Sequence, residues 1–240
     1  MNMALQKPRK SRVPARLDLA QSLTGLALAL FTWAHLFLVS SILLGEEAMY
    51  VVAKTMELAF LSPTGHGYPA AVAMVGVVVS VLFVVHAGLA MRKLPANWKQ
   101  VVEYRSHLAM MRHGDTRQWW VQAVTGFAMF FLASVHLYVI TTNPALIGPY
   151  ESADRVYGFM WPLYAALLVS VEAHAAIGTY RLAMKWGIPG GVPRARMQLL
   201  AKAMTGCFLT LGAATLLAYL KLGYEHRDHA GERYVPAEHR

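Results

Sequence analysis

The chain has 240 residues, of which 56% are hydrophobic, with a formal net charge of +9 and a mean hydropathy of +0.38. This composition is too apolar for a soluble domain and is typical of a small membrane protein that crosses the bilayer several times. The single cysteine, Cys207, excludes an intramolecular disulfide and a cysteine-rich metal site, and no C-x-x-C-H motif is present for c-type haem attachment.

Residues 1–19 are expected to form a polar, basic arm, since they lack the apolar stretch and the small-residue cleavage site of a secretory signal. Five apolar segments follow, each close to the ~20 residues that a helix needs to cross a bilayer. They cover residues 20–44, 70–91, 118–142, 158–186 and 200–222, and a polar tail occupies residues 223–240. The sequence therefore predicts an all-α, polytopic membrane protein whose five transmembrane helices lie within residues 20–222.

Basic residues are distributed unevenly between the two sides that these spans define. The arm, the loop after the second span and the region around the turn after the fourth span carry 16 of the 22 lysines and arginines and only three acidic residues. The other side carries six basic and nine acidic residues. By the positive-inside rule the N-terminus is expected to be cytoplasmic and the C-terminus outside. The positive charge is therefore a topology signal, and nucleic-acid binding is not expected.

Four of the ten histidines lie within apolar spans, one in each of the first four spans: His35, His86, His136 and His174. An ionisable residue inside a bilayer is costly in free energy and usually serves a function. A single intramembrane histidine is about as often a hydrogen-bonded packing residue as a ligand. Four of them, distributed one per helix, favour metal or proton chemistry.

These histidines fall at two depths in the membrane. His86 lies six residues before Arg92, and His174 seven residues before Arg181, which places both ~10 Å from the cytoplasmic boundary at 1.5 Å per residue. His35 and His136 lie ~25–29 Å from the same boundary. The two levels are thus ~16 Å apart, and two histidines from facing helices at one depth are what bis-imidazole ligation of a haem iron needs. The spacing predicts an inner and an outer haem site.

An internal repeat supports this pairing. The first span reads QSLTG…H and the third reads QAVTG…H, with the same spacing up to the histidine. The matching residues are Gln21, Thr24, Gly25 and His35 in the first span, and Gln122, Thr125, Gly126 and His136 in the third. Each glycine lies ten residues inward of its histidine, near the inner level, and Gly76 likewise precedes His86 by ten residues. Such glycines could admit a haem ring or simply allow close helix packing; both readings stay open.

The chain resembles the di-haem cytochrome b membrane subunit of quinol:fumarate reductases and succinate:quinone reductases, of the single-subunit, five-helix kind. The similarity runs from SRVPARLD through the fifth span. It is carried most specifically by HLFLVSSILLG, HAGLAMRK, LAMMRHGDTRQWW, MWPLY and VEAHAAIGTYRLAMKWG. The resemblance implies a four-helix bundle that binds two b haems, with a fifth helix alongside. It also implies that His86 and His174 ligate the inner haem iron, and His35 and His136 the outer one.

Partners and substrate are implied by the same resemblance. A flavoprotein subunit would perform the fumarate/succinate chemistry, and an iron–sulfur subunit would dock on the cytoplasmic face, because this chain has neither a dinucleotide-binding glycine motif nor a cysteine cluster. The expected function is electron transfer from menaquinol through two haems to these subunits, or the reverse as succinate:menaquinone reduction. The expected setting is the bacterial inner membrane, among lipid, and a dimer of such heterotrimers is one option for the assembly.

Further site residues are implied by the match to the family. Glu57 corresponds to the carboxylate that takes part in menaquinol oxidation, where it could accept a proton. Positions near the haem propionates, where cations and hydroxyls would bond carboxylates, are Gln21, Ser22, Trp119, Arg155 and Lys185. The family also places a proton-conducting role on Glu172. It lies two residues from His174, which is ~200° of helix rotation, so the two side chains are expected to face opposite sides.

Two alternatives to this function remain at the level of sequence. One is a cytochrome b subunit of another respiratory dehydrogenase, such as a hydrogenase or formate dehydrogenase, against which the internal repeat and the residue-level match count. The other is a haem-free proton channel or transporter in which the histidines and Glu172 form a relay.

Overall fold

The computed structural model describes residues 11–111 and 114–236, and this part of the chain is helical with no strand. The long helices are α1 (Val13–Val39), α3 (Pro69–Met91), α5 (Gly114–Thr142), α7 (Trp161–Trp186) and α8 (Arg194–Glu225). The shorter helices are α2 (Glu46–Met56), α4 (Trp98–Met111) and α6 (Pro149–Arg155). Short 3₁₀-helical segments are η1 (Ser40–Leu44), η2 (Ala59–Leu61) and η4 (Arg227–His229), and η3 (Val156–Met160) is a π-helical turn that leads into α7.

Five helical segments of the described chain are long and apolar enough to cross a membrane. They cover Val13–Leu44, Pro69–Met91, Thr116–Thr142, Pro149–Trp186 and Arg194–Glu225, one for each predicted span. Their outward faces expose large apolar side chains such as Phe127, Phe131 and Leu217, as expected of helices whose solvent is lipid. The predicted all-α, five-helix membrane architecture is confirmed.

Proline and glycine mark several helix ends. Proline occupies the first turn of α1, α3, α6 and α7, where its missing N–H breaks no hydrogen bond. The chain leaves α7 through Gly187 at φ +63°, a left-handed conformation that glycine adopts without a steric penalty. Polar and basic residues extend several helices past their apolar stretches, so α1 begins at Val13, inside the segment predicted as an arm, and α8 ends at Glu225, inside the predicted tail. Residues 1–10 of that arm lie outside the described part.

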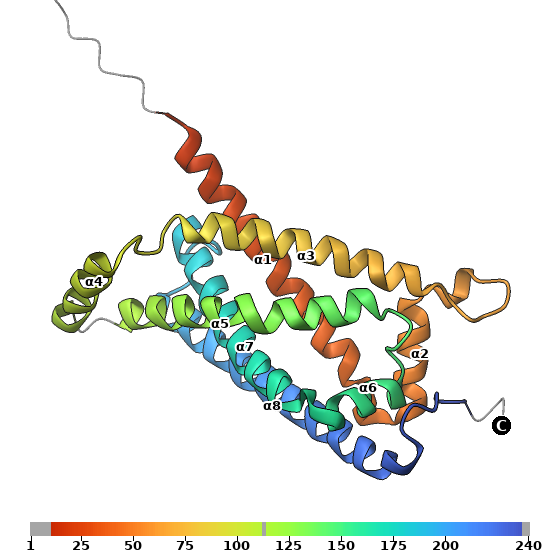
Figure 1. The fold of residues 1–240 in the computed structure, drawn as a ribbon. Coiled ribbons are helices and arrows are strands. Elements are labelled where there is room, and N and C mark those ends of the chain that lie inside the picture. Colours follow the sequence, from red (N-terminus) through yellow and green to blue (C-terminus); the bar gives the residue numbers. More distant parts are fainter. Residues whose placement is uncertain (1–10, 112–113, 237–240) are drawn as a thin grey trace, which may run out of the picture.

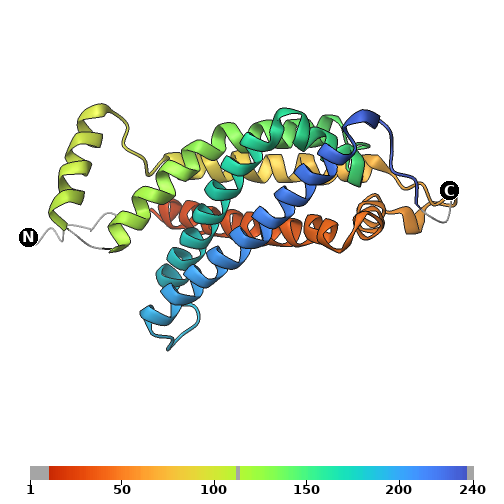
Figure 2. The ribbon, with the colours of Figure 1, turned by 90° about the horizontal axis from the view of Figure 1, so that it is seen from below.

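The membrane helices form a four-membered ring with a fifth helix on its outside. Contacts join α1 to α3, α3 to α5, α5 to α7 and α7 to α1, while α8 packs against α7 and α1 (Figures 1 and 2). Neighbours in the ring run in opposite directions, so α1 lies diagonally across from α5, and α3 from α7. Side chains from a diagonal pair can therefore meet in the middle of the ring.

The two ends of this bundle differ. At one end α1 begins, α3 ends, α5 begins and α7 ends, and Arg92, Lys93, Arg117, Arg181 and Lys185 lie there; we call it the basic end. The other end carries α2 and α6, and we call it the α2 end. Helix α4 extends beyond the basic end, away from the bundle (Figures 1 and 2).

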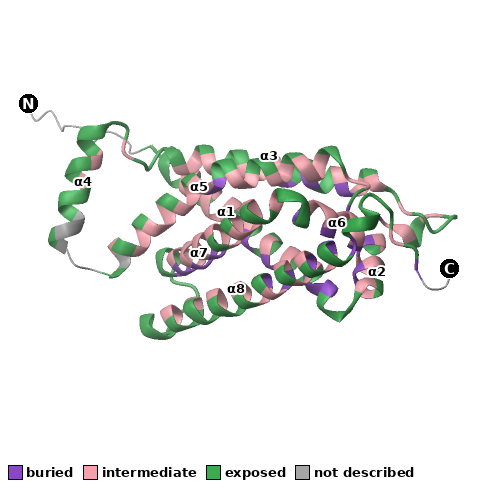
Figure 3. Ribbon diagram, turned by 60° about the horizontal axis from the view of Figure 1, so that its bottom comes forward, coloured by how far each residue is buried: buried purple, intermediate pink, exposed green. Residues whose placement is uncertain are grey.

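The largest buried cluster lies at the α2 end, where α2, α6 and α8 meet (Figure 3). It comprises Ile42, Met49, Ala53, Val72, Ile147, Ala153, Val156 and Tyr219. Helices α2, α4 and α6 replace what the sequence analysis treated as loops. They are too short or too polar to span a bilayer, so they contain no ~20-residue apolar stretch that would reveal them in the sequence.

Candidate functional site

One pair of intramembrane histidines joins α1 and α5. The ring centroids of His35 and His136 lie 6.1 Å apart, with an angle of 53° between the ring planes. His35 stacks on Phe31 at 5.7 Å, and the edge of Tyr164 faces His136 at 5.5 Å. The Nδ1 atom of His136 is buried without a hydrogen-bond partner among the described residues. This pair lies nearer the α2 end of the ring.

The second pair joins α3 and α7. The ring centroids of His86 and His174 are 6.4 Å apart, and the rings are nearly perpendicular at 86°. Both pairs thus span a diagonal of the ring. The two histidine pairs that the sequence analysis grouped by depth are neighbours in the structure, while their role as metal ligands stays a prediction.

The repeated threonine of the T-G motif contacts each histidine of the second pair. Thr24 Oγ1 lies 3.1 Å from Nδ1 of His86, and Thr125 Oγ1 lies 3.4 Å from Nδ1 of His174. The main-chain oxygen of Gln122 lies 2.9 Å from the same His174 nitrogen. A partner on one imidazole nitrogen fixes the ring orientation and leaves the other nitrogen for a metal ion. Both threonines belong to the internal repeat of the sequence, which by itself does not indicate this contact.

The repeated glycine explains why these rings can approach. A Cβ atom on Gly25 would lie 2.7 Å from Cε1 of His86, and one on Gly126 would lie 2.9 Å from Cε1 of His174. Each glycine therefore makes room for the histidine of a neighbouring helix. Because Gly25 and His35 are ten residues apart on α1, the two histidine pairs are separated by ~15 Å along the bundle.

The donor set and its spacing fit a haem iron. An imidazole nitrogen binds a first-row metal ion at ~2 Å, and the ring centre lies ~1 Å further away, so a metal ion between two axial imidazoles places their centroids ~6 Å apart. Both pairs have this spacing. No group of three or more metal-binding side chains occurs in the described part of the chain. A porphyrin needs only two axial ligands from the protein because it supplies four nitrogens itself.

A cavity of about 400 Å³ adjoins the His86–His174 pair, within the size range of cofactor sites. Four residues that the sequence analysis placed near the propionates line it, namely Gln21, Ser22, Trp119 and Lys185. Lys93 and Arg181 line it as well. The cavity therefore combines an imidazole pair with cationic and hydroxyl groups toward the basic end.

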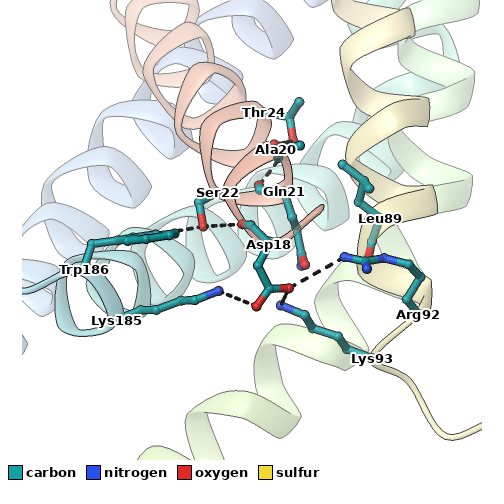
Figure 4. A network of polar contacts seen from close by, with 10 residues as sticks. All are labelled: Asp18, Ala20, Gln21, Ser22, Thr24, Leu89, Arg92, Lys93, Lys185 and Trp186. Carbon is teal, nitrogen blue, oxygen red and sulfur yellow. Dashed lines mark hydrogen bonds and ion pairs between the residues drawn. The ribbon is translucent and has the colours of Figure 1, made fainter. Parts of the chain in front are cut away.

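The lysines at the mouth of this cavity are held by one carboxylate (Figure 4). Asp18 on α1 pairs with Lys185 of α7 at 2.8 Å and with Lys93 at 2.9 Å, just beyond α3, while Arg92 lies 3.7 Å away. The indole N–H of Trp186 donates to Ser22 Oγ at 3.0 Å beside them. Three cations face one carboxylate, and the resulting excess of positive charge suits a ligand that carries carboxylates.

Arg155 lies at the α2 end rather than at this cavity. Its guanidinium donates to Tyr164 Oη at 3.2 Å, to the Leu146 carbonyl at 2.7 Å and to Ser152 Oγ at 3.2 Å. The ring of Tyr164 in turn faces His136. Arg155 is thus connected to the His35–His136 pair through one side chain.

Glu172 and His174 have separate surroundings. Glu172 is fully buried, and Trp33 Nε1 of α1 donates to its Oε2 at 3.2 Å. The other carboxyl oxygen, Oε1, is buried and has no hydrogen-bond partner among residues 11–111 and 114–236. Trp33 itself stacks on Phe208 of α8. Glu172 therefore faces α1 and α8, whereas His174 faces α3 and α5, as the ~200° rotation between them requires.

Glu57 ends helix α2. Its side chain is 96% buried and accepts a hydrogen bond from Lys54 Nζ at 2.7 Å. Its carbonyl accepts a hydrogen bond from the Tyr68 N–H at 2.6 Å, and Gly67 lies against its side chain. The recorded contacts of Glu57 belong to α2 and the following loop, so it is a buried carboxylate at the α2 end.

Comparisons with known proteins agree with this architecture. Residues 100–213 match the family model of the succinate dehydrogenase/fumarate reductase transmembrane subunit. The chain is 48% identical over 225 residues to the fumarate reductase cytochrome b subunit of Wolinella succinogenes, covering 92% of this chain and 87% of the relative. It is also 48% identical over 221 residues to the protein of the same name in Helicobacter pylori strain J99, covering 92% and 86%.

The five-helix fold and these matches make the chain a multi-pass, all-helical membrane subunit of the succinate dehydrogenase/fumarate reductase class. Within that class, the chain belongs to the family of fumarate reductase cytochrome b subunits. It is accordingly the membrane anchor of a fumarate reductase complex, a setting that implies haem b and partner flavoprotein and iron–sulfur subunits.

Proposed function

We propose that this subunit passes electrons from menaquinol, oxidised at the α2 end, to the iron–sulfur and flavoprotein subunits at the basic end. The observation that carries the proposal is the pair of diagonal histidine contacts, with centroids 6.1 and 6.4 Å apart, at two levels of one bundle. Each pair would hold one b haem, and the two haems would supply one-electron carriers at both levels. The same arrangement could serve succinate:menaquinone reduction in the opposite direction.

The chain's own residues would orient and neutralise these groups. Thr24 and Thr125 would hold Nδ1 of His86 and His174, so that Nε2 of each ring is presented to the iron. Lys185, Ser22, Gln21 and Trp119 would bind propionates at the basic-end level, because all four line the adjoining cavity. Arg155 would bind a propionate of the haem at the His35–His136 pair, which lies nearer the α2 end.

Two carboxyl groups would handle protons. Quinol oxidation releases two protons with its two electrons, and Glu57, a buried carboxylate at the α2 end, would accept a proton there. Glu172 would carry protons through the membrane part of the chain, since it is fully buried and one of its oxygens lacks a partner among the described residues. Such a path would offset the charge that electron transfer alone would separate.

The proposed orientation places the basic end in the cytoplasm, with residues 1–19 as a cytoplasmic arm, 20–222 as the membrane domain and 223–240 as an outer tail. The excess of lysine and arginine at the basic end supports it. The partner subunits would then dock at the basic end, next to the His86–His174 level. Two such three-subunit units could associate as a dimer.

Purification of the tagged chain with its co-purifying subunits tests the proposal. We expect a reduced b-type absorbance band, two haems per chain, and oxidation of a menaquinol analogue by fumarate. A folded protein without haem would refute the assignment of the histidine pairs as haem ligands. Two haems without any menaquinol-linked turnover would refute the proposed electron path.

A further inference from the structure

A second cavity lies between α5, α7 and α8, separate from the histidine pairs. It has a volume of about 180 Å³ and is lined by Gln118, Ala176, Ile177, Tyr180, Gln198, Ala201, Lys202 and Thr205. Five of these eight side chains are polar, although the cavity adjoins helices that span the membrane. An apolar void of this size would stay dry, whereas a polar one takes up ordered water.

The cavity lies on the basic-end side of Glu172. Ala176 and Tyr180 follow Glu172 by four and eight residues on α7, so they lie on the same side of the helix. One helical turn, ~5–6 Å, separates Glu172 from Ala176 along the helix axis. The cavity therefore begins about one turn from the buried carboxyl group, and Arg194 Nε and Gln198 Nε2 hydrogen bond to Tyr180 Oη on its lining.

Two buried oxygen atoms, one on Glu172 and one on the cavity wall, have no hydrogen-bond partner within the described part of the chain. They are Oε1 of Glu172 and Oε1 of Gln118, which lines the cavity. A buried polar atom without a partner costs about 1–3 kcal/mol, and ordered water is the usual remedy when space is present. At ~30 Å³ per molecule the cavity has room for several waters.

We propose that ordered water fills this cavity and connects Glu172 to the basic end of the bundle, forming one half of a proton path. The proposal rests on the proposed role of Glu172 as a proton carrier. Trp33 holds Oε2 of Glu172 in place, so exchange occurs at Oε1. The carboxyl group gives its proton to a cavity water, passes through the carboxylate form, and takes another proton from the side of the α2 end.

Proton and electron paths would then use different faces of α7. His174 faces α3 and α5, where it meets His86, while the cavity lies on the side of α8. Neutral groups dominate the inner lining, since Lys202 is exposed whereas Thr205 is half-buried and Tyr180 is buried. Variants on α8 can therefore block the cavity without touching a histidine.

Ala201→Leu is the sharpest variant, because it fills the cavity and removes no polar group. Ala203→Leu, on the exposed face of the same helix, is the matched control. In the complete complex in proteoliposomes, we expect Ala201→Leu to slow menaquinol-analogue oxidation by fumarate roughly tenfold. Haem spectra, and fumarate reduction by a reduced viologen that delivers electrons directly to the partner subunits, should not change. Ala203→Leu should match the parent protein in every assay.

A second readout does not depend on turnover. In infrared difference spectra, the carboxyl C=O band lost in Glu172→Gln identifies Glu172, and its shift on transfer to D₂O reports exchange with water. We expect this exchange to be slower in Ala201→Leu than in Ala203→Leu. Equal exchange and equal turnover in these two variants would overturn the cavity proposal. If Glu172→Gln itself left quinol-linked turnover unchanged, the proposed role of Glu172 would fail instead.

Discussion

The indole N–H of Trp33 donates to Oε2 of Glu172 at 3.2 Å, which ties α1 to α7 at a point where the carboxyl group is completely buried. Trp33 also stacks on Phe208 at 5.7 Å, so α8 belongs to the same contact. An intramembrane carboxyl group is costly in free energy, and within the described part of the chain Trp33 is the one side chain that donates a hydrogen bond to it.

Removing this donor should destabilise the protein. Trp33→Phe keeps an aromatic ring against Phe208 but leaves Glu172 Oε2 without a partner, and we expect a loss of about 1–3 kcal/mol in the free energy of unfolding. The measurement is denaturant unfolding in detergent, followed by the haem absorbance and by circular dichroism. A double-mutant cycle with Glu172→Met isolates the contact, because the methionine side chain has no oxygen to accept the indole N–H. Additive effects in that cycle would mean that the hydrogen bond contributes nothing.

The histidine pairs lead to a prediction about haem content. Because His35 pairs with His136, and His86 with His174, alanine at any one of the four should remove one haem and leave the other. We expect the haem-to-protein ratio to fall from two to one, with the same spectrum for both members of a pair and different spectra for the two pairs. A variant that kept two haems would contradict the assignment of that histidine as a ligand.

The repeated threonines should control how tightly haem is held. Thr24→Val and Thr125→Val keep the side-chain volume but remove the oxygen that contacts Nδ1 of His86 and His174. Loss of such a partner typically costs 10–100-fold in metal affinity, so we expect haem transfer to apomyoglobin to be faster by about this factor. Thr142→Val, at an exposed position, is the control. Unchanged transfer would mean that the threonine hydroxyls serve only their hydrogen bonds to the main-chain carbonyls of Ala20 and Val121.

How far the sequence alone predicts this protein depends on the feature. Length and hydropathy were sufficient for the five spans, because a bilayer demands ~20 apolar residues, and counting residues from charged boundaries correctly grouped the histidines that meet. The role of the T-G repeat could not be predicted, since the threonine contacts a histidine on another helix. Nor could Asp18 be identified as a site residue. Acidic residues are common near a membrane boundary, and its lysine partners are distant in the sequence.

Asp18 should influence the midpoint potential of the haem that we place at the His86–His174 pair. It holds Lys93 and Lys185 at the mouth of the cavity beside that pair (Figure 4). Asp18→Asn removes one negative charge there, so we expect the midpoint potential of the haem at that level to rise while the other haem stays unchanged. Potentiometric titration of the purified complex measures both. Stability should fall by only about 0–1 kcal/mol, since these ion pairs are partly exposed.

Glu103→Gln provides a control for Asp18→Asn, because Glu103 is an exposed carboxylate on α4, which lies beyond the basic end. It should leave both potentials where they are. Equal shifts of both haems in Asp18→Asn would indicate a general change in structure. If neither midpoint potential shifted, Asp18 would lie too far from the haem for its charge to affect the potential.

The chain after α8 should fasten α6 and α2 to the bundle. Asp154 of α6 lies 3.1 Å from Nδ1 of His226 and accepts a hydrogen bond from the Gly231 N–H at 2.8 Å, while Tyr234 Oη donates to Glu47 of α2 at 2.7 Å. Asp154→Ala removes two of these three contacts. We therefore expect faster hydrogen–deuterium exchange in residues 226–236 and in α2, measured by mass spectrometry.

Asp228→Ala tests whether that effect is specific, because its side chain is 78% exposed and its recorded ion pair is with the adjacent Arg227. It should leave exchange in α2 unchanged. Since Glu57 directly follows α2, loosening α2 should also displace the carboxylate that we place in quinol oxidation. Asp154→Ala should therefore raise KM for a menaquinol analogue without loss of haem. Faster exchange in residues 226–236 with an unchanged KM would mean that the order of this segment does not affect the quinol site.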